Sequence, residues 1–284
     1  MTILEESRQQ SAATGVQLVR LRKDFCMRLR DKSIGWELRR FRALFRPNDC
    51  QTRFYQSLLE RSPKGTILDI GSNNGSKAEI FRNLTDFVVA VEPDPDLANL
   101  LRSRFRFRKV RVLESAIGAF NGKLELLRFP GHEAYNTAVQ VWADSVEAAK
   151  HLPKPVKCTV AVCDLQTLID RYGPVKYVKI DIEGWEWEAI STLTTRVPFV
   201  SMEFNLPDFQ SGLERSLKHL GAMGYLFNVA IAEPPAALEW AEWLPAYEAI
   251  ETIVRSGWRY SEVFAKSDVP PVTSSIFNES FPVV

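Results

Sequence analysis

The chain has 284 residues, of which 45% are hydrophobic and 25% are charged, a composition ordinary for one large globular domain or two small ones. Its 36 lysines and arginines balance 35 aspartates and glutamates, so net charge gives no argument for nucleic acid, and no nucleic-acid partner is predicted. The four cysteines lack a CxxC spacing, which argues against a disulfide scaffold; with no membrane-spanning run and no signal peptide, this predicts a cytoplasmic protein.

The N-terminal part of the chain carries the basic residues in excess. Residues 1–15 are polar and aperiodic, whereas residues 16–46 contain ten Lys/Arg against three Asp/Glu, with apolar residues at helical intervals. These basic amphipathic helices either cap the domain or contact lipid headgroups or a lipid-linked substrate. We therefore divide the chain into an N-terminal lead-in with basic helices (1–50), one domain (51–268) and a C-terminal tail (269–284).

Strands and helices alternate from Thr66 onward, which predicts an α/β fold with a mostly parallel sheet covered on both faces. The predicted strands are 66–71, 87–92, 110–117, 122–129, 156–162, 175–181, 197–204, 224–231 and 259–265. The predicted helices are 76–83, 95–104, 142–150, 164–172, 185–193, 208–220 and 236–254. The pair Asn121-Gly122 is typical of a tight hairpin, so strand 122–129 is predicted to pair antiparallel with the strand ending near Ile117.

A glycine-rich turn, LDIGSNNG, joins the first strand to the first helix of this pattern. Its glycines allow the backbone to approach a ligand closely, and the helix N-terminus offers free N–H groups to a carboxylate or phosphate. The spacing is neither GxGxxG nor GxxxxGK[ST], which disfavours a dinucleotide or a triphosphate. The alternative is that the turn only connects the strand to the helix.

The next two strand ends are consistent with a nucleoside. Glu92, about 20 residues after the turn, ends the second strand, where a carboxylate can accept both hydroxyls of a ribose. It could instead lie beside the N-cap of the following helix. Residues 115–117 at the third strand end lie where an adenine edge would be, or they are simply a tightly packed strand end.

Charged residues are concentrated in the stretch VKIDIEGWE, where a core strand should be apolar. Lys179 and Asp181 point to the same face of a strand, so an ion pair near the cleft is expected, and carboxylates in clefts are candidates for acid–base chemistry. The alternative is a structural ion pair, with Glu183 capping the next helix. Asp181, Glu183 and Glu203 could hold a magnesium ion, but their spacing is not diagnostic and no metal is predicted.

Four motifs in order, LDIGSNNG, VEPDP, SAIG followed by NGKLEL, and VKIDIEGWE, resemble the FkbM-type S-adenosylmethionine-dependent methyltransferases over residues 67–203. The resemblance implies a Rossmann-like class I methyltransferase core with a seven-stranded, mostly parallel sheet, to which the patterns above add a β-hairpin and an N-terminal helical extension. It also implies S-adenosylmethionine as the cofactor and O-methylation of a sugar, glycan or related natural product. One departure is Cys163-Asp164-Leu165 where similar sequences often have threonine, leucine and aspartate, so a role tied to that aspartate is not carried over.

The resemblance also assigns roles to individual residues. The methionine part of the cofactor would contact the glycine-rich turn, the ribose would contact the second strand end, and the adenine would contact the third. The implied cofactor-binding residues are Asp69, Gly71, Asn73, Asn74, Gly75, Glu92, Ser115, Ala116, Ile117 and Asp181. Asp181 and Glu183 would lie where the methyl donor meets the acceptor.

A base would help to deprotonate a hydroxyl acceptor, and we identify three candidates: Asp181, Glu183 and His132. His132 lies in the loop FPGHEAYNT and is otherwise a surface residue. Two alternatives to a methyltransferase are a nucleotide-sugar or NAD-dependent oxidoreductase, disfavoured by the turn spacing, and a non-catalytic nucleoside-binding protein. The expected partner is a small-molecule or glycan acceptor, and no oligomeric state is predicted.

Overall fold

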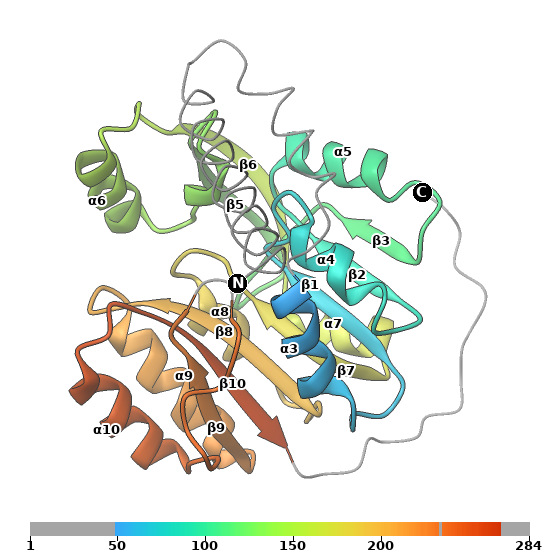
Figure 1. The fold of residues 1–284 in the computed structure, drawn as a ribbon. Helices are drawn as coiled ribbons and strands as arrows, with labels where there is room; N and C mark the ends of the chain where they lie inside the picture. The colour runs from blue at the N-terminus through green and yellow to red at the C-terminus, as the bar shows by residue number, and fades with distance from the viewer. Residues whose placement is uncertain (1–48, 233–234, 268–284) are drawn as a thin grey trace, which may run out of the picture. The chain divides into compact units, whose positions relative to one another are not determined.

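The computed structural model describes residues 49–232 and 235–267 (Figure 1). The basic helices predicted within residues 1–50 and the tail 269–284 lie outside the described residues, apart from the last two positions of the first segment. The predicted domain boundaries therefore stay predictions. Within the described ranges, no helix is long and apolar enough to cross a membrane.

A seven-stranded sheet forms the centre of the described chain, in the order β3-β2-β1-β7-β8-β10-β9. Its strands are β1 (Thr66–Ile70), β2 (Val88–Val91), β3 (Val110–Leu113), β7 (Val175–Ile180), β8 (Phe199–Asn205), β9 (Tyr225–Ala230) and β10 (Tyr260–Ser267). The pairings from β3 to β8 are parallel, and β10 is antiparallel to both of its neighbours. The predicted mostly parallel, Rossmann-like sheet is confirmed.

Helices cover both faces of this sheet (Figure 1). They are α3 (Asp49–Leu59), α4 (Ser76–Phe81), α5 (Pro95–Arg104), α7 (Leu165–Tyr172), α8 (Glu186–Ile190), α9 (Gln210–Ala222) and α10 (Ala246–Ser256). One hydrophobic core contains Tyr55, Phe81 and Leu101 from α3, α4 and α5, and the other contains side chains of α7 to α10. β1 and β7 are buried along their whole length, as expected for central parallel strands covered on both faces, and their charged residues Asp69, Lys176 and Lys179 are buried with them.

A second sheet of three strands corrects two predictions. It contains β4 (Ala116–Ile117), β5 (Gly122–Arg128) and β6 (Val156–Cys163) in the order β4-β6-β5. The predicted strand 110–117 is therefore broken into β3 and β4, which lie in different sheets. The hairpin partner was also wrong, because β5 pairs antiparallel with β6 instead of β4. The Asn121 side chain does not support a tight turn here: its Nδ2 donates to Asp164 at 2.5 Å, and its Oδ1 accepts from the Asp164 backbone N–H at 3.2 Å.

The helix predicted over 236–254 is shorter in the structure and begins at Ala246. Residues before it pair with β9 instead, because Leu244 forms a bridge with Phe227. The buried Asn228 side chain also accepts a hydrogen bond from the Trp240 N–H at 3.1 Å and donates to the Trp240 carbonyl at 2.9 Å. These contacts satisfy backbone groups that a helix would otherwise use, and Pro245 then occupies the N-cap of α10.

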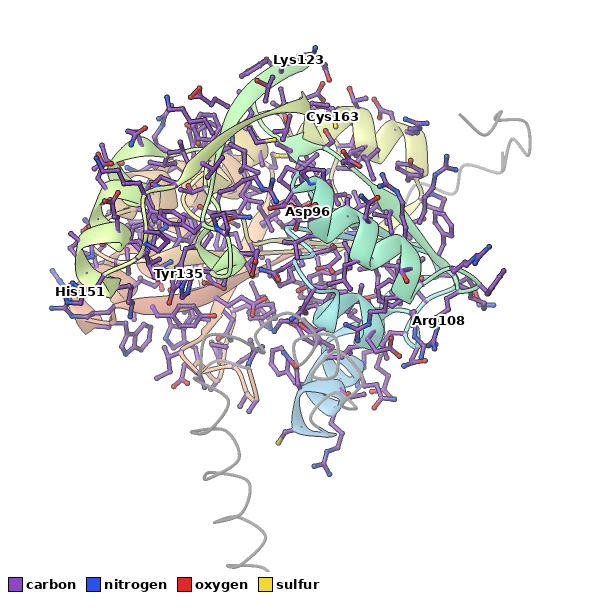
Figure 2. The ribbon with its side chains drawn as sticks, turned by 90° about the horizontal axis from the view of Figure 1, so that it is seen from above. Asp96, Arg108, Lys123, Tyr135, His151 and Cys163 are labelled. Carbon is purple, nitrogen blue, oxygen red and sulfur yellow. The ribbon has the colours of Figure 1, made fainter. Side chains whose placement is uncertain are left out.

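The chain between β5 and β6 forms an insertion, residues 129–155, that contains the 3-10 helix η1 (Glu133–Tyr135) and α6 (Gln140–Lys150). Figure 2 shows Tyr135 and His151 of the insertion on one side of the molecule and Arg108 on the opposite side. The insertion has a small hydrophobic core of its own, with Phe129 and Ala143 packed against Leu127 of β5.

A buried carboxylate joins the two sheets. Asp94 is fully buried at the N-cap of α5 and accepts from the backbone N–H groups of Asp96 at 2.8 Å and Leu97 at 3.3 Å. Arg128 of β5 binds both of its oxygens, at 2.6 and 2.8 Å, and Asn136 of the insertion donates to it at 2.9 Å. The Asp94 side chain thus caps a helix of the main sheet and also binds the second sheet and the insertion.

We expect Asp94→Ala to lower the free energy of unfolding by about 3–5 kcal/mol, because it leaves a partly buried arginine without its main partner. The measurement is urea unfolding followed by circular dichroism. Asp96→Ala is the matched control, since Asp96 also pairs with Arg128 but its side chain is 70% exposed, and its loss should cost less than about 1 kcal/mol. Equal losses in the two variants would contradict the role given to Asp94.

Candidate functional site

A cavity of about 670 Å³ lies at the carboxyl ends of the parallel strands, where α/β sheets bind their ligands. The main sheet contributes the glycine-rich turn after β1, the ends of β2, β7 and β8, and Tyr260 at the start of β10. The insertion contributes residues of η1 and α6 from the other side. The cavity is therefore built between the two sheets that Asp94 joins.

The backbone of the glycine-rich turn is determined by close contacts with neighbouring strands. Gly71 has a φ of 78°, and a Cβ there would lie 1.7 Å from the Asp181 carbonyl oxygen. The N–H groups of Gly71 and Ser72 both donate to the Val91 carbonyl at 3.0 Å. Only glycine fits at position 71, and this allows the turn to cross directly above the end of β7.

Most of the predicted cofactor residues line the cavity: Gly71, Asn73, Asn74, Glu92, Ser115, Ala116, Ile117 and Asp181. Asp69 and Gly75 do not. Asp69 is completely buried beneath the turn, where it accepts from the Ser72 hydroxyl at 2.9 Å. Burial raises the pKa of Asp69, although the nearby Lys179 and the hydrogen bond from Ser72 act in the opposite direction. Through its hydrogen bond with Ser72, the buried Asp69 side chain stabilises the glycine-rich turn.

Glu92 faces the cavity from the end of β2. One of its oxygens accepts from the Asn73 N–H at 2.8 Å and the other from the Asp94 N–H at 3.0 Å. Burial raises the pKa of Glu92 to about 7, despite these two backbone hydrogen bonds. The N-cap of α5 is Asp94, so Glu92 both lies beside a helix cap and presents a carboxylate to the cavity.

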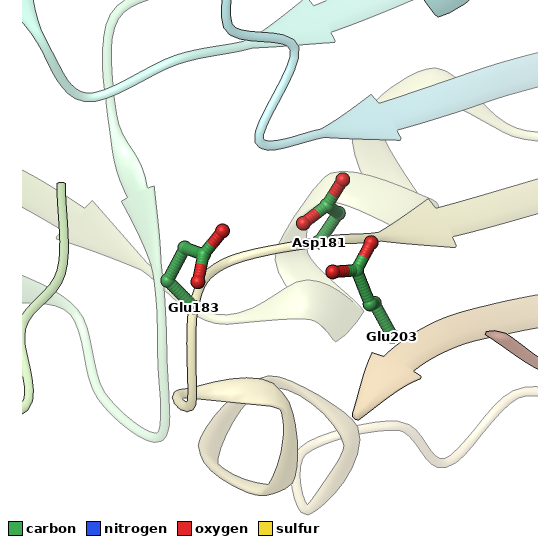
Figure 3. Close-up of side chains that lie close together, drawn as sticks. All are labelled: Asp181, Glu183 and Glu203. Atoms are coloured by element: carbon green, nitrogen blue, oxygen red, sulfur yellow. The ribbon is translucent and has the colours of Figure 1, made fainter. Parts of the chain in front are cut away.

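Three carboxylates meet at the junction of β7 and β8 (Figure 3). One oxygen from each of Asp181, Glu183 and Glu203 lies within 4.8 Å of the others, so this group could share a proton or hold a metal ion. The predicted ion pair forms, with Lys179 Nζ 2.7 Å from Asp181 Oδ2. Burial alone would lower the pKa of Lys179, but the surrounding carboxylates, Asp181 first, raise it above its ordinary value.

Glu183 is held by the insertion in an unusual conformation. It has a φ of 54°, which is uncommon for a residue other than glycine. Thr137 Oγ1 donates to its carbonyl at 2.8 Å, and Trp142 Nε1 donates to its carboxylate at 3.3 Å. Burial and the neighbouring carboxylates Asp181 and Glu203 raise the pKa of Glu183 well above its ordinary value.

Trp142, Thr137 and Phe209 were missed by sequence reasoning. The ring of Phe209 lies 5.0 Å from that of Trp142 and packs against Gly184, where a Cβ would lie 2.2 Å from the Phe209 ring. Trp142 and Glu183 are 41 positions apart in the chain. Neither residue belongs to a local pattern that marks this contact, so no signal in the sequence could have found it.

His132, the third candidate base, is exposed and does not line the cavity. It is the residue before η1, and the following residues Tyr135 and Asn136 face the cavity instead. The structure therefore brings Asp181 and Glu183 together but leaves His132 apart from them.

A family model described as Methyltransferase FkbM domain matches residues 69–247. The chain belongs to the FkbM methyltransferase family. With this match, the strand order of the main sheet, antiparallel only at β10, is that of a Rossmann-like class I methyltransferase, as predicted. A search among curated proteins finds no match.

Solved structures show distant similarity to the FkbM chain. A crystal structure of methyltransferase FkbM from Methylobacillus flagellatus KT has 14% identity and a TM-score of 0.46, over 75% of this chain and 47% of that one. The chain thus spans about half the length of that protein. A TehB-like SAM-dependent methyltransferase from Corynebacterium glutamicum has 11% identity and a TM-score of 0.43, over 82% and 95% of the two chains. An O-methyltransferase from Bacillus cereus in complex with SAH has 16% identity and a TM-score of 0.41, over 84% and 93%.

We expect Gly71→Ala to destabilise the FkbM domain by more than about 3 kcal/mol, because a methyl group at position 71 clashes with the backbone of Asp181, directly after β7, as well as straining φ. Gly131→Ala is the control, since Gly131 has a φ of 85° but nothing within 4 Å of the added Cβ. It should cost only about 1 kcal/mol. Chemical unfolding of both variants measures the difference, and similar values would show that the close approach is unimportant.

Proposed function

We propose that this FkbM-family protein transfers a methyl group from S-adenosylmethionine to a hydroxyl oxygen of a small-molecule or glycan acceptor. The observation that carries the proposal is that two features line one cavity. Glu92 lies on one side, where its carboxylate could bind the ribose of a nucleoside, and the three carboxylates around Glu183 lie on the other. S-adenosylmethionine is the cofactor. The acceptor enters from the side of the insertion, and a cytoplasmic location is part of the same proposal.

The residues around the glycine-rich turn fit this cofactor. Each oxygen of Glu92 accepts only one hydrogen bond from the backbone, and a carboxylate oxygen has room for a second, so both ribose hydroxyls can donate to it. The cavity wall near Glu92 also includes one small polar residue and two apolar ones, a composition that suits a purine ring. They are Ser115, Ala116 and Ile117. The spacing of the turn still disfavours the oxidoreductase alternative.

The carboxylate group suits the deprotonation of a hydroxyl acceptor. Asp181 is held in place by its ion pair with Lys179, whereas burial and like charges raise the pKa of Glu183 and make it a stronger proton acceptor. Bound S-adenosylmethionine would supply its methyl group by cleavage of a carbon–sulfur bond, leaving S-adenosylhomocysteine, and Glu183 would take the proton of the acceptor hydroxyl. The walls of the cavity position the oxygen in line with that bond.

We expect the affinity for S-adenosylmethionine to increase as the pH rises from about 6 to about 8, because only ionised Glu92 accepts from both ribose hydroxyls and burial raises its pKa to about 7. Isothermal titration calorimetry should also show proton release on binding near neutral pH. Glu92→Gln should weaken binding by about tenfold at pH 8 and remove this pH dependence.

Glu114→Gln is the control for this titration, since Glu114 is a nearby but exposed carboxylate that pairs with Arg102. It should bind the cofactor like the wild type at every pH. An unchanged pH dependence in Glu92→Gln would remove Glu92 from the ribose site.

Turnover should be found by screening glycans, glycolipid intermediates and other hydroxylated compounds with a methyl-labelled donor. With an acceptor in hand, Asp181→Asn and Glu183→Gln should each lower kcat by about 100-fold or more while cofactor affinity stays within a few-fold. His132→Gln tests the third candidate, for which the exposed position predicts a rate near that of the wild type. Cofactor binding without transfer to any acceptor would support the non-catalytic alternative.

A further inference from the structure

The end of α5, the turn that follows it and the start of β3 carry a dense group of cations. Residues 102–111, called here the basic loop, include six basic residues and no acidic one. They are Arg102, Arg104, Arg106, Arg108, Lys109 and Arg111. Because the whole chain has a formal net charge of only +1, this concentration is a local feature of the surface.

Only part of this charge is neutralised. Arg102 pairs with Glu114 at 2.9 Å, and Lys109 pairs with Asp86 at 3.3 Å. Both are exposed pairs, which are worth little and exchange readily with other partners. Arg104 and Arg108 share Glu79, which also binds Arg82.

Two cations of the basic loop remain for other partners. Arg106 and Arg111 are exposed, and neither forms an ion pair with another residue in the ranges that the structure describes. The loop therefore keeps a surplus of positive charge after its internal pairs are counted.

Phe107 projects from the middle of the basic loop. It is 89% exposed, the most exposed of the large hydrophobic side chains in the described chain, and its ring lies 5.2 Å from the Arg106 guanidinium. Phe105, two residues earlier, is buried against Gly75, so the loop is anchored on one side and presents an aromatic ring on the other. A single exposed apolar residue is ordinary, but one surrounded by uncompensated cations is suited to an anionic, partly apolar surface.

The exposed residues of the basic loop lie outside the proposed active site, although Arg104 supports the glycine-rich turn by donating to the Asn74 carbonyl at 2.6 Å. The loop leads into β3, the edge strand of the main sheet, and none of its residues lines the 670 Å³ cavity. In Figure 2, Arg108 lies on the opposite side of the molecule from Tyr135 and His151. Contact through the loop would therefore leave the cavity and the insertion free.

We propose that the basic loop binds the surface of an anionic lipid bilayer, with its arginines at the lipid phosphates and Phe107 at the boundary between headgroups and acyl chains. Arginines attract anionic lipids, and an aromatic ring gains free energy when it leaves water at that depth. The inference does not depend on the proposed methyl transfer.

A bilayer fits the basic loop better than a nucleic acid does. Single-stranded nucleic acid is bound along a positively charged groove with several aromatic rings on which bases stack. The basic loop instead has one protruding ring at a short turn between a helix and an edge strand, and the chain has a balanced charge overall. Binding to nucleic acid is therefore treated as an outcome that would overturn the proposal.

The test is co-sedimentation of the full chain with vesicles of phosphatidylcholine alone and of phosphatidylcholine with phosphatidylglycerol. We expect binding to the anionic vesicles only, and its release at high salt. Phe107→Ala should weaken this binding by about tenfold. Arg106→Gln with Arg111→Gln should weaken it by about 25-fold, at about fivefold for each charge.

Matched controls come from other faces of the molecule. Tyr247→Ala removes an aromatic side chain that is 75% exposed on α10, and Lys123→Gln with Lys154→Gln removes two exposed cations. Both controls should bind vesicles like the wild type. Thermal unfolding and S-adenosylmethionine affinity should be unchanged in the loop variants, which would show that they fold.

Three results would overturn the proposal. The first is no preference of the wild type for anionic vesicles. The second is wild-type binding by the loop variants, which would place the lipid contact elsewhere, such as in the basic N-terminal segment. The third is loss of binding to single-stranded oligonucleotides in the loop variants while vesicle binding stays unchanged.

Discussion

The arrangement of the two sheets depends on the buried carboxylate of Asp94. Its hydrogen bonds connect the first turn of α5 to Arg128 and Asn136, which lie 34 and 42 positions further along the chain. A buried carboxylate without partners would cost roughly several kcal/mol of stability. The charge of Asp94 is tolerated in this position because each of its oxygens accepts hydrogen bonds. The insertion consequently comes to lie over the carboxyl ends of the parallel strands.

The two halves of the cavity have different origins as a result. The half around Glu92 and the glycine-rich turn comes from the main sheet and its loops, with Ala116 and Ile117 of β4 beside it. The half around Glu183 is completed by Thr137 and Trp142 from the insertion, which bind both the backbone and the side chain of that residue. The left-handed backbone conformation of Glu183 is therefore stabilised by contacts from the insertion.

Local patterns were sufficient to predict most of the main sheet and many of the residues that line the cavity. Continuous apolar runs mark buried parallel strands, and the ends of parallel strands necessarily meet at one edge, so Glu92 and Asp181 could be placed in one cleft. The errors arose where a distant side chain overrides a local preference. Asn121 binds Asp164 instead of forming a hairpin turn, and Asn228 binds the backbone near Trp240, where helix periodicity predicted a longer α10. The contact of Trp142 with Glu183 has no local signature at all.

The separate hydrophobic core of the insertion has a consequence for the evolution of these enzymes. Phe129 and Ala143 pack with Leu127 and share no buried cluster with the helices of the main sheet. Apart from Trp142, which contacts Glu183 and Phe209, residues on α6 can therefore change without disturbing the packing that supports the turn at Gly71. A lineage could in this way remodel the insertion side of the cavity as a single module, while the glycine-rich turn and the strand end at Glu92 are inherited intact.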